Sequence, residues 1–238
     1  MNHKDSVYHY EGLLQSGRWF GSLPEKLRKT LLNSATVVQL SAGQMLFSQD
    51  DPLQGIYAVL SGGISIGRHR EDGKEALLTL IDPPNWFGEI TLFDRMNRTH
   101  HAYAVSDTIL LHIAGNTLDQ ILEKEPRYWQ NFGQLLTEKL RILLDQAEDL
   151  ALRSTAQRLA KRLVLFADNY GNWKDRSRRT INIPQEQLAM MLFITRQTTN
   201  QILKDLERQG LIKLVYGAIE IIDFEGLRLF ADTSSEAK

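Results

Sequence analysis

Residues Ile183–Leu214, IPQEQLAMMLFITRQTTNQILKDLERQGLIKL, form the most informative segment of the chain. Its pattern predicts two short helices joined by a tight turn, with Thr195 as the N-cap residue of the second helix. In the second helix, a 3.6-residue period separates an apolar face from a polar face. The apolar face carries Thr199, Ile202, Leu203 and Leu206, and the polar face carries Arg196, Gln197, Asn200, Gln201 and Lys204.

The polar face has the chemistry that reads the DNA major groove. An Arg can bind guanine O6 and N7 as a fork, and Asn or Gln can bind adenine N6 and N7. For this helix taken alone, the alternative is an ordinary amphipathic helix whose polar face is solvated. We predict a DNA-binding surface made of Thr195, Arg196, Gln197, Thr198, Asn200, Gln201 and Lys204.

The residues after this helix favour DNA binding. Gly210 is a typical helix C-terminus, and Leu211–Tyr216 and Ala218–Ile222 have the pattern of two short strands around a turn at Gly217. Together with the helix pair, they predict a winged helix-turn-helix. Before the pair stands a basic cluster, which is either a solvated loop or, beside a recognition helix, a phosphate contact: Lys174, Arg176, Arg178 and Arg179.

Charge is distributed unevenly along the chain. Leu150–Leu214 holds 12 Lys and Arg against 5 Asp and Glu, a net charge of +7, whereas the whole chain carries −1 and the remainder therefore −8. The basic segment is the one that contains the helix pair. Phosphate binding requires this asymmetry.

Composition excludes several classes of protein. With 238 residues, 42% hydrophobic and 24% charged, the chain is long enough for two folded domains. It contains no Cys, which excludes disulfides, thiolate zinc sites, iron–sulfur clusters and a catalytic thiol. No apolar run resembles a signal peptide or a membrane span, so we expect a cytoplasmic protein without a membrane partner.

Between Thr36 and Ile113 the pattern changes to short runs of apolar and β-branched residues separated by Gly. Many short strands with regular turn signals predict a β-sandwich or barrel of the jelly-roll kind. The interior of such a domain can hold a ligand.

Helical spacing returns from Pro126 to about Leu152. Within this segment, apolar residues step by four and three positions as in a coiled-coil seam, which predicts a partner helix and hence a homodimer. The alternative is that the seam packs on the β domain of its own chain. Ser154 and Gln157 resemble a capping box, so we place the end of the long helix and a hinge just before them. The seam consists of Leu136, Leu140, Leu143, Ala147 and Leu150.

These features, in this order, resemble the Crp/Fnr family of bacterial transcription regulators from about Trp19 to Phe230. FGEITLFDRMNRT at Phe87–Thr99 looks like the family's phosphate-binding cassette, and TRQTTNQILKDLERQGLI at Thr195–Ile212 looks like its recognition helix. The resemblance implies an α+β protein with an N-terminal cyclic-nucleotide-binding-type β jelly roll, a long dimerisation helix and a C-terminal winged helix-turn-helix. The corresponding segments would be 1–123, 124–153 and 154–238.

The resemblance also implies an effector site at Gly88, Glu89, Arg98, Thr99 and His100. In the family's cyclic-nucleotide binders, the residues that match Glu89, Arg98 and Thr99 bind the ribose 2′-hydroxyl and the cyclic phosphate. His100 departs from the small residue usual there. Leu143 and Leu144 stand where cAMP receptor-type proteins reach the purine with a Thr-Ser pair. The effector is therefore left open among cAMP, cGMP, cyclic di-GMP and none.

For DNA recognition, the family uses an Arg-Glu pair and an Arg one turn later. The matching residues here are Arg196, Gln197 and Gln201, so we expect an operator different from the usual family half-site. Phe193 stands at a turn position where Gly is common, and a positive φ there would cost strain.

An enzyme would need a catalytic constellation, and none is visible. His100 and His101 are adjacent and would point to opposite faces of a strand, and His112 fits a satisfied core or edge histidine better than a ligand. A haem sensor using one His is a further alternative in this family. We expect no metal site and no enzymatic activity. The interpretation is a homodimeric transcription regulator on a palindromic operator, acting with RNA polymerase. Its alternatives are a ligand-independent regulator and a nucleotide-sensing module that acts through protein partners.

Overall fold

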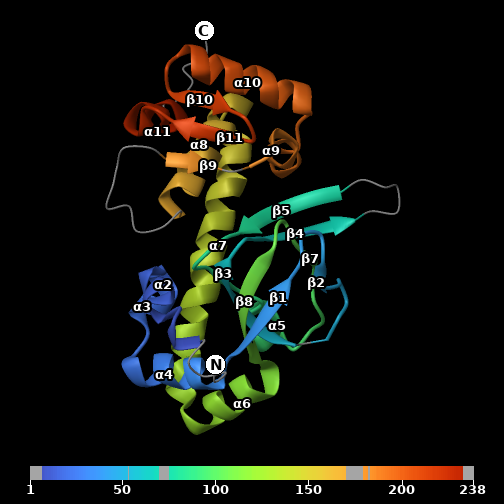
Figure 1. Ribbon diagram of the computed structural model, residues 1–238, viewed down its shortest axis with the longest axis vertical. Coiled ribbons are helices and arrows are strands. Elements are labelled where there is room, and N and C mark those ends of the chain that lie inside the picture. The colour runs from blue at the N-terminus through green and yellow to red at the C-terminus, as the bar shows by residue number, and fades with distance from the viewer. Residues whose placement is uncertain (1–6, 53, 70–74, 170–178, 182, 233–238) are drawn as a thin grey trace. The chain divides into compact units, whose positions relative to one another are not determined.

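The structure is a computed structural model that describes residues 7–52, 54–69, 75–169, 179–181 and 183–232. It divides into two compact units, 1–141 and 142–238, and helix α7 (Trp129–Leu152) contributes to both (Figure 1). Within the described ranges, no helix is long and apolar enough to cross a membrane.

The first unit contains two four-stranded antiparallel sheets, in the orders β1-β8-β3-β6 and β2-β7-β4-β5. Their inner faces enclose an apolar core built around Phe47, Tyr57 and Phe87. The predicted jelly-roll sandwich is therefore confirmed. Its strands are β1 (Thr36–Leu40), β2 (Met45–Phe47), β3 (Gly55–Ser61), β4 (Ile64–His69), β5 (Glu75–Ile81), β6 (Trp86–Phe87), β7 (His101–Ala104) and β8 (Thr108–Ala114).

Strand β3 explains why the sandwich has a helical layer outside it. Its residues are buried on both faces of the sheet. Tyr57 and Val59 point into the jelly roll, whereas Ile56 and Ala58 belong to a second core on the outer face. A continuous apolar run needs such double burial, because successive side chains of a strand alternate between faces.

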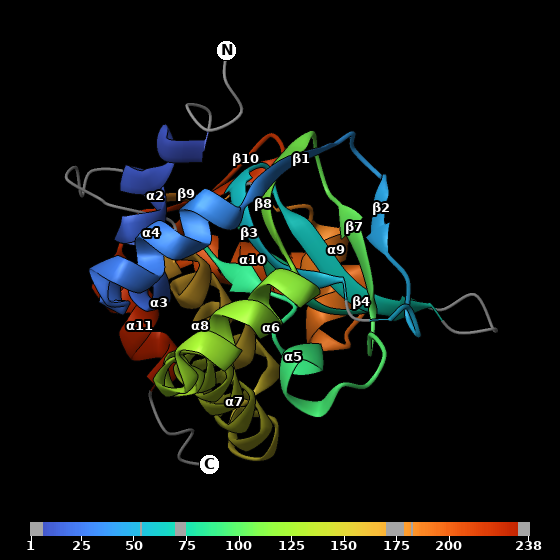
Figure 2. The same ribbon diagram turned by 90° about the horizontal axis from the view of Figure 1, so that it is seen from below.

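The outer core is covered by helices α2 to α4, by α6 and by the first turns of α7, which lie on the far side of sheet β1-β8-β3 from β2 and β7 (Figure 2). Aromatic rings fill it: Phe20 stacks on Trp86 at 5.5 Å, and Trp19 meets the same indole edge-on at 5.3 Å. The helices are α2 (Glu11–Ser16), α3 (Arg18–Ser22), α4 (Glu25–Ser34), α6 (Gly115–Lys124) and the 3-10 turn η1 (Pro126–Tyr128).

The second unit is a winged helix, as predicted. Its three-stranded sheet has the order β10-β11-β9, and α8 packs against α11 and α9. Strand β9 was not predicted from the sequence. The elements are α8 (Thr155–Asn169), β9 (Arg179–Ile181), α9 (Gln185–Leu192), α10 (Arg196–Arg208), β10 (Ile212–Val215), β11 (Ala218–Ile221) and α11 (Phe224–Asp232).

The capping box at the start of α8 is confirmed. The Ser154 backbone N–H donates to Gln157 Oε1 at 2.9 Å, and the Gln157 N–H donates to Ser154 Oγ at 3.3 Å. The reciprocal pair satisfies two N–H groups that have no partner within the helix. The capping box thus fixes where α8 begins, directly after the end of α7.

Candidate functional site

Helix α10 has the predicted cap and the predicted two faces. Thr195 Oγ1 accepts a hydrogen bond from the Thr198 backbone N–H at 3.1 Å. The predicted apolar residues, Thr199, Ile202, Leu203 and Leu206, are all buried. The opposite face lines a shallow open depression on the surface, formed by Arg196, Gln197, Asn200, Gln201 and Lys204.

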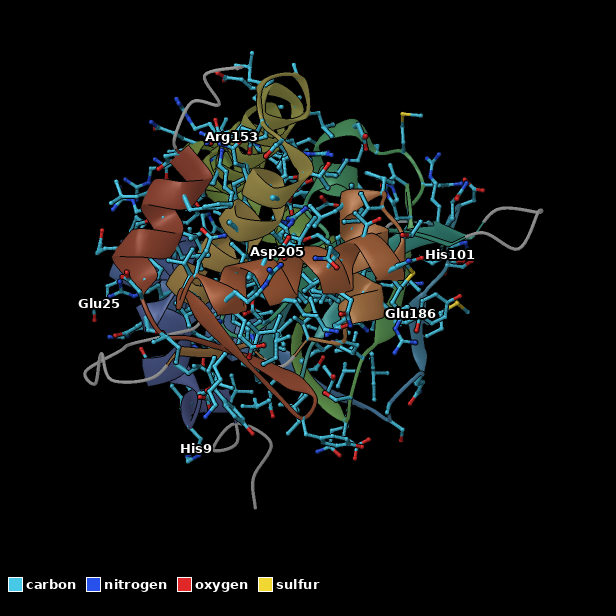
Figure 3. The ribbon with its side chains drawn as sticks, turned by 90° about the horizontal axis from the view of Figure 1, so that it is seen from above. His9, Glu25, His101, Arg153, Glu186 and Asp205 are labelled. Atoms are coloured by element: carbon cyan, nitrogen blue, oxygen red, sulfur yellow. The ribbon has the colours of Figure 1, made fainter. Side chains whose placement is uncertain are left out.

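Some polar side chains of this face are held by neighbours, and others extend into solvent. Asn200 Nδ2 donates to Gln185 Oε1 of α9 at 3.1 Å, and Gln201 Nε2 donates to Asp205 Oδ1 at 3.0 Å. Figure 3 places Asp205 on α10, with the neighbouring α9 carrying Glu186. Arg196, Gln197 and Lys204 are exposed. The face therefore combines preoriented amides with extended cations.

The turn between α9 and α10 is strained at one residue. Phe193 has φ +55° in the left-handed region, and it is 70% exposed. Its N–H bonds to Met190 O and the next N–H, of Ile194, bonds to Ala189 O, as in a helix end that usually carries Gly. The turn at Phe193 therefore does have the positive φ for which the sequence predicts a cost. For a non-Gly residue it costs about 1 kcal/mol or more.

The wing is the β10–β11 hairpin. Its tip consists of Tyr216, which is fully exposed, and Gly217, whose φ of +73° suits glycine. The basic cluster predicted before the helix pair falls largely outside the described residues. This applies to Lys174, Arg176 and Arg178, while Arg179 is described only by its backbone, in β9.

The cassette begins at Phe87, the last residue of β6, and contains a short helix, α5 (Ile90–Asp94), that was not predicted. Gly88 has φ +94°, and a Cβ atom there would lie 2.9 Å from Arg98 Nη1 and 3.0 Å from Gly55 O. No larger residue fits without displacing the guanidinium. The absence of a side chain at Gly88 thus allows Arg98 to reach the backbone.

Arg98 is buried, with 3% of its surface exposed. Nη1 donates to Gly88 O at 2.9 Å and Nη2 to Gly55 O at 2.7 Å, and the guanidinium lies 4.4 Å from the centre of the Phe47 ring. Its Nε is buried without a partner in the described structure. Burial lowers the pKa of Arg98 from its ordinary value, and Tyr57 and other nearby groups oppose this shift.

Glu89 is the cassette's second buried charge, with 1% exposure. Its Oε2 accepts from Lys139 Nζ of α7 at 2.7 Å, whereas Oε1 is buried without a partner in the described structure. Sequence reasoning missed Lys139. The only signal was position, because Lys139 stands one helical turn before Leu143, where the family resemblance already directed attention.

Thr99 and His100 pair with each other at the edge of the cassette. Thr99 is exposed, and its hydroxyl lies 2.8 Å from His100 Nδ1. Burial, followed by the positive charge of Arg68, lowers the pKa of His100. The structure therefore gathers Gly88 and Arg98 with Glu89 nearby, and it gives Thr99 and His100 a separate local contact.

His112 and His101 have structural partners. His112 Nε2 lies 2.8 Å from Gln54 O, and its ring stacks on Tyr57 at 4.5 Å, so the prediction of a satisfied core or edge histidine is confirmed. His101 Nδ1 accepts from the Gln49 backbone N–H at 3.1 Å. Over the described residues, no group of three or more His, Asp or Glu side chains could hold a metal ion.

The predicted seam on α7 is largely exposed. Leu136 is half-buried, and Leu140, Leu143, Ala147 and Leu150 are exposed, with Leu140 at 51%. The seam's role as a dimer interface stays a prediction.

The fold and these surfaces define a class of protein, a winged-helix DNA-binding domain joined through a long helix to a jelly roll of the cyclic-nucleotide-binding type. Two family models match the chain, the cyclic nucleotide-binding domain over residues 37–125 and the Crp-like helix-turn-helix domain over residues 157–230. The chain belongs to the Crp/Fnr family.

Curated relatives of this chain are transcription regulators. It is 28% identical over 218 residues to the CRP-like cAMP-activated global transcriptional regulator of Mycobacterium tuberculosis, covering 91% of this chain and 97% of that protein. It is 28% identical over 180 residues to the cyclic AMP receptor protein of Thermus thermophilus, covering 75% and 80% of the two chains.

Solved structures share the fold. FixK2 from Bradyrhizobium japonicum superposes with a TM-score of 0.75 at 17% identity, covering 84% of this chain and 99% of that one. The cyclic di-GMP-responsive regulator CLP from Xanthomonas campestris gives a TM-score of 0.67 at 20% identity, covering 83% and 99%. The predicted fold class and family are confirmed.

Proposed function

We propose that this protein is a homodimeric, sequence-specific DNA-binding transcription regulator controlled by a small nucleotide effector. It would act in the cytoplasm, on a palindromic operator, together with RNA polymerase, and without enzymatic activity. Residues 1–123 would form the sensor domain, residues 124–153 the dimerisation helix and residues 154–238 the DNA-binding domain.

The observation that carries this proposal is the exposed face of α10. A capped helix presents Arg196, Gln197 and Lys204 to solvent, with Asn200 and Gln201 held between them. Its other face is anchored in the core. Such a rigid helix with donor-rich side chains is what base readout in the major groove requires. Thr195 and Thr198, at the N-terminus of the helix, would contact phosphates.

The effector part of the proposal rests on the cassette. Two buried polar atoms there have no described partner, the Oε1 acceptor of Glu89 and the Nε donor of Arg98. A ribose hydroxyl can donate to the first and a phosphate oxygen can accept from the second. Thr99 and His100 would border such a ligand. Relatives named as cAMP-activated make a cyclic nucleotide the leading class, with cAMP, cGMP and cyclic di-GMP as candidates.

The DNA-binding proposal is tested by selecting binding sites for the purified protein from a random duplex library. The expected result is a two-fold symmetric consensus whose affinity falls steeply as salt rises. A protein that enriches no sequence, or whose binding ignores salt, would instead support the protein-partner alternative.

The effector proposal is tested by calorimetric titration with cAMP, cGMP and cyclic di-GMP. Arg98→Lys keeps a buried cation but loses the guanidinium fork, so we expect it to weaken binding of the true effector at least tenfold. Arg95→Lys is the matched control, because Arg95 is exposed and pairs with Asp119. No binding by the parent protein would leave a ligand-independent regulator.

A further inference from the structure

A small cavity lies within the C-terminal unit, between the last turns of α7, helix α8 and the turn that follows α9. Its volume is about 70 Å³, several times the roughly 10–15 Å³ that one water molecule requires. Three basic residues line it, Arg158, Lys161 and Arg162, and Asp149 supplies the sole carboxylate among its lining residues. Phe193 is among the apolar residues that complete the wall.

The single carboxylate is already engaged. Asp149 is 8% exposed, and it accepts from Arg153 Nε and from Lys161 Nζ, each at 2.7 Å. Arg153 also donates to Ala231 O and pairs with Asp232 at the end of α11. Figure 3 labels Arg153, which lies at the junction between α7 and α8. Through Lys161 and Arg153, Asp149 therefore connects the end of α7 to α8 and to the end of α11.

Arg158 and Arg162 have N–H groups without a hydrogen-bond acceptor among the described residues. Across the described part of the chain, the Arg162 guanidinium has no hydrogen bond and no ion pair. Arg158 Nη2 donates to Thr155 Oγ1 at 3.3 Å, and its Nε is buried without a partner there. Burial lowers the pKa of Arg162, and Asp149 offsets only part of that shift.

Guanidinium groups withdrawn from water are costly unless an acceptor pairs with them. Arg presents fixed forks of N–H groups that match the spacing of oxyanion oxygens. The apolar wall adds a low dielectric, which strengthens attraction between charges. An anion in the cavity would satisfy donors that the described part of the chain leaves unpaired.

We propose that this cavity binds a small tetrahedral oxyanion of the phosphate class between Arg158 and Arg162. The ion's oxygens accept from both guanidinium groups and lie near the Lys161 ammonium. Because α7 and α8 both line the cavity, the bound ion holds the last turns of α7 against α8. This site is separate from the nucleotide cassette.

A carboxylate from a second copy is the competing source of negative charge. In a parallel pair of α7 helices, the positions that flank the seam near Leu143 and Leu150 are Leu144 and Ala151 on one side and Gln146 and Arg153 on the other. None of the four carries a carboxylate. This pattern favours a diffusible oxyanion over a partner's side chain.

The experiment uses the full-length protein without DNA or nucleotide. Inorganic phosphate is titrated against chloride at constant ionic strength, and the melting temperature and calorimetric heat are followed. We expect a saturable rise in Tm with phosphate. Arg162→Gln and Arg158→Gln should each weaken the apparent affinity at least tenfold. Arg228→Gln, an exposed arginine on α11, is the matched control and should bind as the parent does.

Three results would overturn the proposal. One is a rise in Tm that does not saturate with phosphate and that chloride reproduces. Another is equal loss in Arg228→Gln, which would indicate nonspecific charge. The third is a parent that ignores phosphate while Arg162→Gln dissociates the dimer in sedimentation, which would assign the anion to the second copy. Since neither DNA nor nucleotide is present, these outcomes leave the proposed regulatory function untouched.

Discussion

Lys139 Nζ lies 2.7 Å from Glu89 Oε2, and this ion pair joins helix α7 to the buried start of the cassette. Glu89 is 1% exposed, so its carboxylate depends on that partner. We expect Lys139→Met to lower the free energy of unfolding by about 3 kcal/mol, because it leaves a buried charge unpaired. Urea unfolding measures this loss.

The control for that experiment is Lys124→Met, at an exposed position in α6, where a change below about 0.5 kcal/mol is expected. Adding Glu89→Gln to Lys139→Met should restore much of the lost stability, because the buried charge is then gone. Equal losses in the single and double variants would contradict an energetic role for the pair.

Arg196 stands at the exposed N-terminal end of α10. We expect Arg196→Ala to reduce discrimination between operator and random DNA by about 1–3 kcal/mol, with weak nonspecific binding retained. Competition binding at fixed salt measures the ratio of the affinities for operator and random DNA. Arg208→Ala, at the other end of the same helix, should leave it unchanged, and so the two variants separate base readout from charge loss.

Leu140 is 51% exposed on the predicted seam. We expect Leu140→Asp to weaken dimerisation at least tenfold, because it would place charges opposite each other in an apolar interface. Sedimentation equilibrium gives the constant. Ile142→Asp is the matched control, since Ile142 is 43% exposed on the same helix but lies off the seam. Identical sedimentation profiles for the two variants would rule out the seam as the dimer interface.

Phe193 holds a φ of +55° at the turn before the recognition helix. Glycine adopts that region without a steric cost, so Phe193→Gly should raise the unfolding free energy by about 1 kcal/mol. Thermal and urea unfolding report this change. Phe193→Ala keeps the Cβ strain and removes the ring, and it should not stabilise. If both variants destabilise, contacts of the ring outweigh the strain.

Asp82 gives a pH dependence with a definite sign. Burial raises its pKa from the ordinary 3.8 to about 6, although the bond from Asn85 Nδ2 acts in the opposite direction. The folded state therefore holds a proton that the unfolded state releases. The resulting stabilisation is complete below about pH 3.8 and is lost as pH rises through about 6.

Asp82→Asn removes this titration and keeps the acceptor for Asn85. Relative to the parent, we expect the variant to gain about 2 kcal/mol between roughly pH 4.5 and roughly pH 7.5. Urea unfolding across that range measures the difference. Asp145→Asn, at an exposed position on α7, should show no such trend. A gain that does not depend on pH would contradict the raised pKa.

Local patterns predicted the recognition helix well because its determinants are local. The Thr195 cap, the apolar positions of α10 and the Gly210 terminus all act within a few residues of each other. The capping box at Ser154 belongs to the same class. By contrast, helix α5 and strand β9 are short, and their formation depends on neighbours far along the chain.

The order of elements and the two faces of α10 follow from the sequence alone, since periodicity, capping and turn chemistry are properties of neighbouring residues, and the cassette residues follow from the family resemblance. The environments of these residues follow only from the folded structure. Lys139 meets Glu89 across 50 positions, Arg98 turns to the carbonyls of Gly55 and Gly88, and Arg162 is left without an acceptor among the described residues. Burial and charge balance are set by packing between distant segments, and no local pattern encodes them.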